Sequence, residues 1–449
     1  MAIGLVLTAC RAEPGIVPSL DALRQPTGLA VSPTGAVLLV TNGNWDRVET
    51  DSTLMAVDLA ELFAALEDEG SGACRRVSSD DPTLECNPAA FIDPQATVRL
   101  GTGAGNIAID QPAGEAGLVR LLVTTRSPAS VTWMDLVQGG EGVRLDCGQD
   151  DDQRCGEAHE IRASDNDRLP GEPSRVVVDD QGARYAYVPH LLGGALSLLA
   201  LDGENGPELA DVEGDFFRAG PFEDEELIGG FGVASLPCDP LAPSDESRDC
   251  ERPVLFASQR YFPGVRQFGV APGLDLLLSG PEVTLDAINP EVVEARPFMG
   301  DLVFEDAHGD HLLVVQTTPP ALLRVDTRLG DDGSPRNALV GALPLCDNPN
   351  VIAVTRPEAD EEAVVAEPLA LVTCRSAGRL AVVGLGSFRM LASVPVGEGA
   401  HEVVVDHERG QAYVSNPEED TISIVELDPR SPRRFQEWAR LGLGAGTRD

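Results

Sequence analysis

The sequence contains no lysine, so every one of its 33 Lys+Arg positions is arginine, against 73 Asp and Glu residues. The resulting formal net charge of −40 repels phosphate backbones, which excludes nucleic acid as an expected partner. Aromatic residues are scarce, at 4% of the chain. No run of about 18 apolar residues occurs, so no internal membrane-spanning helix is predicted. The excess of acidic residues is expected to keep the surface solvated. The alternative is that these residues attract cations or a basic partner.

Sequence signatures of catalysis are also absent. The chain has no G-x-S-x-G, H-E-x-x-H or C-x-x-C and no Cys/His nucleophile pair. The stretches GTGAG (101–105) and GLGAG (442–446) do not match G-x-G-x-x-G, and the first leads into a predicted strand, so no dinucleotide site is expected. HGDH (308–311) and CGQDDDQRC (147–155) are predicted to be solvated turns. Ca²⁺ at the acidic loop is the alternative, although its spacing does not match an EF-hand loop. We therefore predict no catalytic residue, no metal site and no cofactor.

The nine cysteines follow a pattern that indicates disulfide bonds. Setting Cys10 aside, eight form four neighbouring pairs, Cys74 with Cys86, Cys147 with Cys155, Cys238 with Cys250, and Cys346 with Cys374. An even set of paired cysteines without metal-site spacing is typical of an oxidising compartment.

Cys10 has a different explanation. The residues Leu7-Thr8-Ala9-Cys10 follow an apolar run and precede the polar, Pro-containing RAEPGIVPS, and in this they resemble a bacterial lipobox, whose Cys becomes the lipidated mature N-terminus. The run is short and lacks a preceding Lys or Arg, so residues 1–10 are interpreted as a truncated signal peptide and 11–24 as a linker. The alternative is an ordinary N-terminus with a spare Cys.

A unit of about 60 residues recurs seven times along residues 25–446. Each copy has a Gly- or Pro-containing start, an apolar strand, a turn, a second strand ending in small polar residues, and a third alternating strand. The first strands are predicted to begin at the following residues: Leu29, Ile107, Val176, Val233, Leu302, Ile352 and Val403. A fourth strand fits before the next unit, for example at 96–101 or 391–397. The pattern predicts an all-β, seven-bladed β-propeller of four-stranded antiparallel blades.

The repeat resembles the YVTN-type β-propeller blade. Its namesake tetrapeptide aligns with LVTN at residues 39–42 and YVSN at 413–416. In such a blade the 1–2 and 3–4 loops emerge on one face of the disc, while the 2–3 loops and the links between blades emerge on the other, which we name the linker face. Blade topology then places the 74–86, 147–155 and 238–250 pairs on the first face and 346–374 on the linker face.

The linker face is the predicted recognition surface, because its loops converge on the axis. Residues expected at the starts of the innermost strands are Thr27, Asn106, Arg175, Phe231, Asp301, Asn350, His401 and Glu402. The 2–3 loops add Asn42, Asn44, Trp45, His190, Arg260, Tyr261 and Phe262. Trp45, Tyr261 and Phe262 are the candidate contact residues in a chain with few aromatics, and coverage of blade edges is the alternative.

These observations favour a monomeric lipoprotein of the bacterial cell envelope, attached to the outer membrane through Cys10 and facing the periplasm or the cell surface. Its expected role is that of a binding or scaffold module for a small ligand or another envelope protein. Two alternatives stay open. The resemblance also implies propeller enzymes, lactonase-like hydrolases or parts of oxidoreductases, and the acidity fits a purely structural, salt-adapted surface protein.

Overall fold

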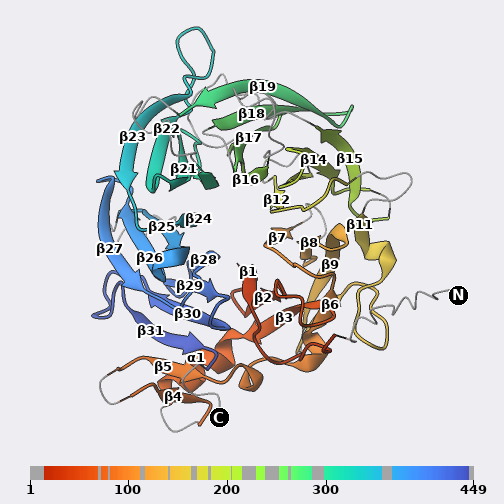
Figure 1. Ribbon diagram of the computed structural model, residues 1–449, viewed down its shortest axis with the longest axis vertical. Coiled ribbons are helices and arrows are strands. Elements are labelled where there is room, and N and C mark those ends of the chain that lie inside the picture. Colours follow the sequence, from red (N-terminus) through yellow and green to blue (C-terminus); the bar gives the residue numbers. More distant parts are fainter. Residues whose placement is uncertain are drawn as a thin grey trace, which may run out of the picture.

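The computed structural model describes residues 15–68, 72–78, 81–111, 117–139, 142–162, 169–179, 184–203, 205–214, 229–237, 252–260, 264–285, 298–355 and 367–443. Within these ranges seven antiparallel sheets surround one axis, as Figure 1 shows. The predicted seven-bladed β-propeller is therefore confirmed. Five residues on which the sequence predictions depend lie outside the described ranges: Cys10, Cys238, Cys250, Tyr261 and Phe262.

The strands of blades one to four follow one another from the axis outward. Blade one has β1 (Pro26–Val31), β2 (Val37–Asn42), β3 (Ser52–Asp58) and β6 (Val98–Leu100); blade two has β7 (Ile107–Asp110), β8 (Arg120–Arg126), β9 (Ala129–Gly139) and β10 (Gly142–Asp146), with β11 (Glu160–Arg162) also on β9. Blade three has β12 (Val177–Val178), β13 (Tyr185–Pro189), β14 (Leu196–Ala200) and β15 (Glu208–Glu213); blade four has β16 (Gly230–Ser235), β17 (Val254–Gln259), β18 (Gly264–Ala271) and β19 (Leu276–Thr284).

The remaining blades have the same order. Blade five has β20 (Phe298–Phe304), β21 (His311–Thr318), β22 (Ala321–Asp326) and β23 (Ala338–Pro344); blade six has β24 (Pro349–Val354), β25 (Leu369–Cys374), β26 (Arg379–Gly384) and β27 (Arg389–Pro395). Blade seven has β28 (Val403–Asp406), β29 (Gln411–Asn416), β30 (Thr421–Glu426) and β31 (Glu437–Leu441), extended by β5 (Leu84–Cys86) and β4 (Cys74–Arg76). One α-helix, α1 (Leu59–Glu67), is found among the described residues, and none of their helices is long and apolar enough to cross a bilayer.

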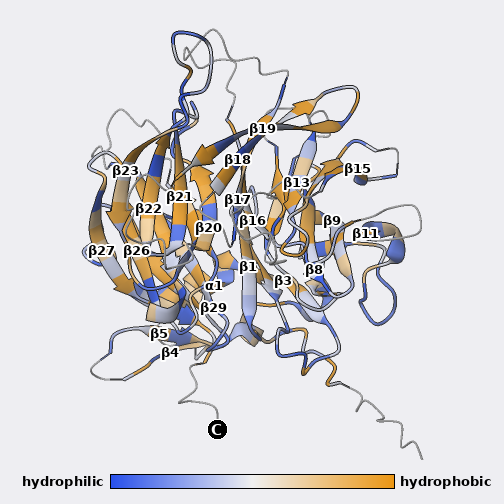
Figure 2. Cartoon of the chain, turned by 45° about the horizontal axis from the view of Figure 1, so that its top comes forward, coloured by the Kyte–Doolittle hydropathy of each residue, from blue (hydrophilic) through white to orange (hydrophobic). Residues whose placement is uncertain are grey.

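Hydrophobic side chains are buried mainly between blades. The buried apolar residues of the described chain fall into seven clusters, and each cluster lies between two neighbouring sheets. Inner strands such as β2 are therefore buried on both faces and read as continuous apolar runs, whereas the outer strand β23 alternates exposed and half-buried residues. Figure 2 shows the apolar residues concentrated on the strands and the hydrophilic ones on the connecting loops.

Buried hydroxyl groups join several blades near the axis. The Thr41 hydroxyl, at the third position of the LVTN tetrapeptide, accepts the amide hydrogen of Gly28 in its own blade at 2.7 Å and donates to the carbonyl of Gly105 in blade two at 2.7 Å. The equivalent hydroxyls make the same two kinds of bond, Ser258 with Gly232 N (2.9 Å) and Gly300 O (2.8 Å), and Thr373 with Val351 N (3.2 Å) and His401 O (2.9 Å). In blades one, four and six, the Thr or Ser of the tetrapeptide is therefore an inter-blade link.

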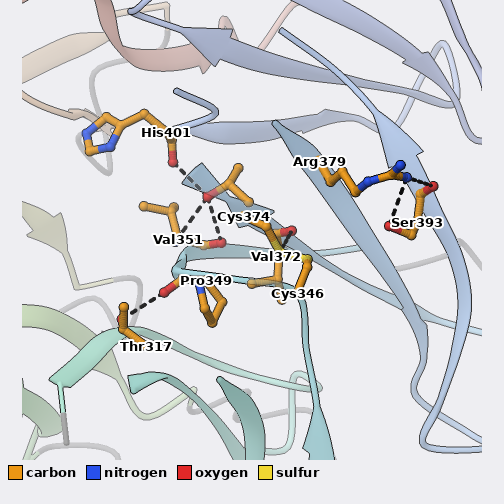
Figure 3. The surroundings of a disulfide bond; sticks show 10 residues. Thr317, Cys346, Pro349, Val351, Val372, Cys374, Arg379, Ser393 and His401 are labelled. Atoms are coloured by element: carbon orange, nitrogen blue, oxygen red, sulfur yellow. Dashed lines mark hydrogen bonds between the residues drawn. A yellow bond between two sulfur atoms is a disulfide. The ribbon is translucent and has the colours of Figure 1, made fainter. Parts of the chain in front are cut away.

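Cys346 and Cys374 form a disulfide between the segment that leaves blade five and the end of β25 in blade six. Figure 3 shows its surroundings, including the bond of 2.7 Å that the Thr317 hydroxyl of blade five donates to the Pro349 carbonyl of blade six. This pair lies at the linker face, where blade topology places it.

The other two described disulfides lie on the outer rim, so their predicted position on the opposite face is wrong. Cys147 and Cys155 close a loop between β10 and β11, because the long strand β9 pairs with β10 along one half and with β11 along the other. This loop lies against β6 of blade one, with Arg99 N donating to Gln153 O at 2.7 Å. The position of the fourth strand of blade two is thus shared by β10 and β11, with the disulfide loop between them. The spacing of apolar residues in the sequence does not reveal such an interruption.

The third disulfide hairpin contributes to ring closure. Cys74 and Cys86 face each other on β4 and β5, and β5 pairs in parallel with β31, the last strand among the described residues. This hairpin comes from the 3–4 connection of blade one, as the sequence predicted, but it extends the sheet of blade seven near the end of β31 (Figure 1). Blades one and seven are thus held together at the rim as well as near the axis, where Gln25 N donates to Asp420 Oδ1 at 2.7 Å.

Replacing the Thr41 hydroxyl should destabilise the fold. Thr41→Val keeps the side-chain shape but leaves the buried Gly28 amide and Gly105 carbonyl without this partner, which costs about 1–3 kcal/mol of unfolding free energy. Thr34→Val, in the exposed 1–2 turn of the same blade, is the control and should change stability by about 0.5 kcal/mol or less. The free energy of unfolding of both variants is measured with denaturant. Equal losses of unfolding free energy in the two variants would show that the Thr41 hydroxyl does not stabilise the fold through its bonds between blades.

Candidate functional site

Four of the predicted linker-face residues are buried parts of the scaffold. Thr27 is fully buried and donates to the Ala104 carbonyl at 2.7 Å, and the Asn106 amide exchanges two hydrogen bonds with the backbone of Val176, at 2.8 and 2.9 Å. Asn42 and His190 occupy the last tetrapeptide position of blades one and three. Both are predicted members of the recognition surface, but both are buried, and each bonds a hydroxyl on the third strand of its blade, Thr53 at 3.0 Å and Ser197 at 2.8 Å.

Three predicted residues meet on the axis as a buried ion cluster. Arg175 of blade three makes a two-pronged contact with Glu402 of blade seven, at 3.1 and 3.2 Å, and lies 3.5 Å from Asp301 of blade five. Burial raises the pKa of both carboxyl groups and Arg175 opposes this rise. Burial also acts to lower the pKa of Arg175, but the two carboxylates outweigh it and the pKa is raised. Arg175 is thus held charged, and the cluster joins three non-adjacent blades.

Trp45 lies on the linker face in a braced 2–3 loop of blade one. Asn44 is buried and bonds the backbone of Glu49 in both directions, at 2.8 and 3.1 Å, while Trp45 N donates to Gln25 Oε1 at 2.7 Å. The Trp45 ring is half-buried and meets the ring of His401 edge-on, with centroids 5.0 Å apart. The structure therefore brings together two predicted residues from blades one and seven.

Two arginines that the sequence analysis did not single out complete this group. The guanidinium carbons of Arg126 and Arg375 lie 5.5 and 5.4 Å from the centre of the Trp45 ring, within the range of a cation–π contact. Both directly follow the residue at the last tetrapeptide position of their blades. That shared repeat position is the signal in the sequence that could have identified them.

His401 is held as a neutral imidazole in a defined orientation. Burial lowers its pKa well below 6.5, and Arg375, Arg175, Arg126 and Arg260 lower it further. Asn350 Oδ1 accepts from Arg260 Nη1 at 2.8 Å, which turns the Asn350 amide nitrogen toward His401 Nδ1 at 3.4 Å. Since Nδ1 then accepts, the single ring proton of His401 is assigned to Nε2, where it can be donated.

Phe231 is buried beneath the linker face. It is 8% exposed and the guanidinium carbon of Arg260 lies 4.4 Å from its ring centre, so this predicted linker-face residue packs against an arginine and is buried from solvent. The other linker-face aromatics of the prediction, Tyr261 and Phe262, are outside the described residues.

A pocket of about 320 Å³ lies beside Trp45. Its walls come from blades one, six and seven and from the segment before β1, and they consist of Arg24, Gln25, Trp45, Asp46, Arg375, Pro417, Glu418 and Asp420. Trp45 and Arg375 thus belong both to the pocket and to the group around His401. This arrangement, an aromatic ring and a cation beside a small hollow, is suited to binding a small polar molecule.

The described residues offer no metal centre. No group of three or more His, Cys, Asp or Glu side chains within the described ranges is arranged to hold a metal ion. In the 147–155 loop, Asp150 Oδ1 accepts the backbone amides of Asp152 and Arg154, both at 3.0 Å, so this carboxylate closes the turn.

The pH dependence of stability should report on His190. Burial lowers its pKa to about 4, whereas an unfolded His titrates near 6.5. Between these values the unfolded state binds more protons, so stability falls as the pH drops, by roughly 3 kcal/mol in total for this group. His190→Asn introduces the residue found at this position in blades one and seven, and its unfolding free energy should fall less steeply between pH 6.5 and 4.5. Parallel pH profiles for the two proteins would contradict the assignment.

Comparisons with known proteins support the fold alone. No family model and no curated protein match the chain. Among solved structures, it is similar to hydrazine synthase of Kuenenia stuttgartiensis, with a TM-score of 0.52 and 13% identity over 94% of this chain and 99% of that one. It is also similar to the periplasmic gluconolactonase of Pseudomonas aeruginosa, with a TM-score of 0.51 and 14% identity over 84% and 87% of the two chains. At such identities the likeness establishes a shared β-propeller architecture and carries no activity with it.

Proposed function

We propose that this chain is a binding module of the bacterial cell envelope that captures a small molecule at Trp45 on the linker face. One observation carries the proposal: the half-buried Trp45 ring contacts His401 and two guanidinium groups at the edge of the pocket of about 320 Å³. The braced loop of blade one holds this ring in place before any ligand arrives. Such preorganisation lowers the entropic cost of binding.

The envelope location is supported by two independent features. Three disulfides in the described residues indicate a chain that folds in an oxidising compartment. The lipobox-like Leu7-Thr8-Ala9-Cys10 supports attachment to the outer membrane through a lipid on Cys10. The repeat resembles the YVTN-type blade, and membership of that family of β-propellers is part of the same proposal.

A lactonase-like hydrolase is the second candidate function. The observation in its favour is the neutral imidazole of His401 among arginines, because its Nε2–H can donate to a reacting oxygen and guanidinium groups can stabilise a developing oxyanion. A binding module returns its captured molecule unchanged, whereas a hydrolase returns the opened product.

Truncation of Trp45 should separate binding from stability. Purified protein is incubated with a small-molecule extract of the source cells, and the bound compounds are identified by mass spectrometry. Trp45→Ala should cost about 2 kcal/mol or more of affinity, so that capture is lost, while stability falls by only about 1 kcal/mol because the ring is half-buried.

The control is Trp438→Ala on the outer strand of blade seven, which should retain capture. If the wild-type protein captures nothing from the extract, or Trp45→Ala captures as well as wild type, the purely structural role is favoured over a binding face at Trp45.

Removal of the Cys10 thiol should release the protein from membranes. The lipid is attached through this thiol, and a multiply acylated Cys anchors stably where one acyl chain does not. Cys10→Ser, expressed behind a complete signal peptide, should therefore appear in the soluble fraction after detergent-free lysis, and wild type in the membrane pellet. Sedimentation of the variant with membranes would contradict lipid anchoring.

A further inference from the structure

Three arginines occupy the same repeat position in alternate blades. In the pairing of first and second strands, Val123, Ala257 and Val372 are equivalent, because they face Ile107, Val233 and Ile352 in blades two, four and six. The residues three positions later are Arg126, Arg260 and Arg375. All three therefore stand where the second strand reaches the linker face, separated around the axis by two, two and three blades. We name them the arginine triangle.

The arginine triangle surrounds His401. Arg126 and Arg375 reach it through Trp45, which lies within 5.5 Å of both guanidinium carbons and 5.0 Å from the imidazole centroid. Arg260 reaches it through Asn350, whose amide bonds Arg260 at 2.8 Å and His401 at 3.4 Å. The Nε2 proton of His401 adds a neutral donor to this cationic group.

Among the described residues, the carboxylates near this group leave it cationic toward an incoming ligand, because most of them are engaged elsewhere. Of the two aspartates in the pocket wall, Asp46 accepts from Arg24 at 2.7 Å and Asp420 accepts from Gln25 N at 2.7 Å. Asp301 and Glu402 are buried on the axis and engaged by Arg175. Glu418 lies 3.4 Å from Arg375, but both side chains are substantially exposed, so this pair is weak and can be displaced. Each guanidinium has five N–H donors in a fork that matches carboxylate geometry, so its existing bonds leave capacity for a ligand.

From this arrangement we infer that the ligand is a small polycarboxylate, with its carboxylate groups distributed over the arginine triangle and one of them accepting from His401 Nε2. The inference rests on the proposed binding function and names its ligand class. A chain with a net charge of −40 repels anions over most of its surface. Concentrating three arginines at one repeat position creates a local site where an anion is attracted.

The sign of the local potential can be measured with ions alone. In a Trp133→Phe/Trp438→Phe background, Trp45 is the remaining tryptophan, and its fluorescence is quenched with iodide or with caesium. We expect the ratio of iodide to caesium quenching to be at least about threefold higher for Trp45 than for a free, uncharged tryptophan derivative, since a cationic group attracts anions. A ratio equal to or below that of the free derivative would overturn the inference and leave the extract-capture experiment at Trp45 unaffected.

Ligand class is tested on the otherwise unaltered protein by thermal shift with citrate, inorganic phosphate and glycerol. Citrate should raise the melting temperature at concentrations where glycerol does not, and Arg126→Gln, Arg260→Gln or Arg375→Gln should each weaken citrate binding roughly tenfold by removing a charged hydrogen bond. Arg389→Gln on the outer strand of blade six changes the net charge equally and should bind citrate as wild type does. Stabilisation by phosphate but not citrate would overturn the polycarboxylate assignment, as would equal losses in the Arg389 control.

Discussion

Polar side chains that bond two neighbouring blades at once are the interaction on which the ring depends. Thr41, Ser258 and Thr373 do this with tetrapeptide hydroxyls, and Asn106, Ser174 and Thr317 do it from other positions, so that six of the seven boundaries are bridged near the axis. Hydrophobic clusters between the sheets provide most of the buried area, but they do not fix the angular position of one blade against the next. Directional hydrogen bonds do, because a buried group that loses its partner costs about 1–3 kcal/mol.

This regularity explains the arrangement at the linker face. In the tetrapeptide, the residue at position three bonds the neighbouring blade, and the residue at position four bonds the third strand of its own blade. The residue that follows is therefore the first whose side chain can project from the blade. Arginine at that place in blades two, four and six therefore converges on the axis without any further adjustment of the backbone. The buried ion cluster of Arg175, Asp301 and Glu402 comes from blades three, five and seven. Blades two, four and six therefore contribute arginines to the linker face, and blades three, five and seven contribute the charged residues buried on the axis.

The sequence is informative about what repeats. Strand starts, the fourth strands and the number of blades follow from apolar runs and turn residues that recur, and the first strands begin within a few residues of the expected positions, as at Ile107 and Val403. The predictions fail where a single blade departs from the pattern. The interrupted outer strand of blade two and the transfer of β4 and β5 to blade seven depend on contacts between residues far apart in the chain, which local patterns do not encode. Local patterns also do not separate contact residues from scaffold residues such as Asn42 and His190, because a polar residue at a predicted loop can equally be a buried turn anchor.

The parallel pairing of β5 with β31 has a consequence for how the protein is made. Leu84 and Ala439 are partners, so β5 is paired with β4 on one edge while its other edge has no partner until β31 has also been synthesised. Contacts of such long sequence separation form late, since the entropy of closing the loop between them must be overcome first. A folding intermediate in which β31 is not yet in place would present an unpaired β-strand edge on β5, and such edges are open to intermolecular pairing. Placement of β31 therefore both completes blade seven and covers this edge.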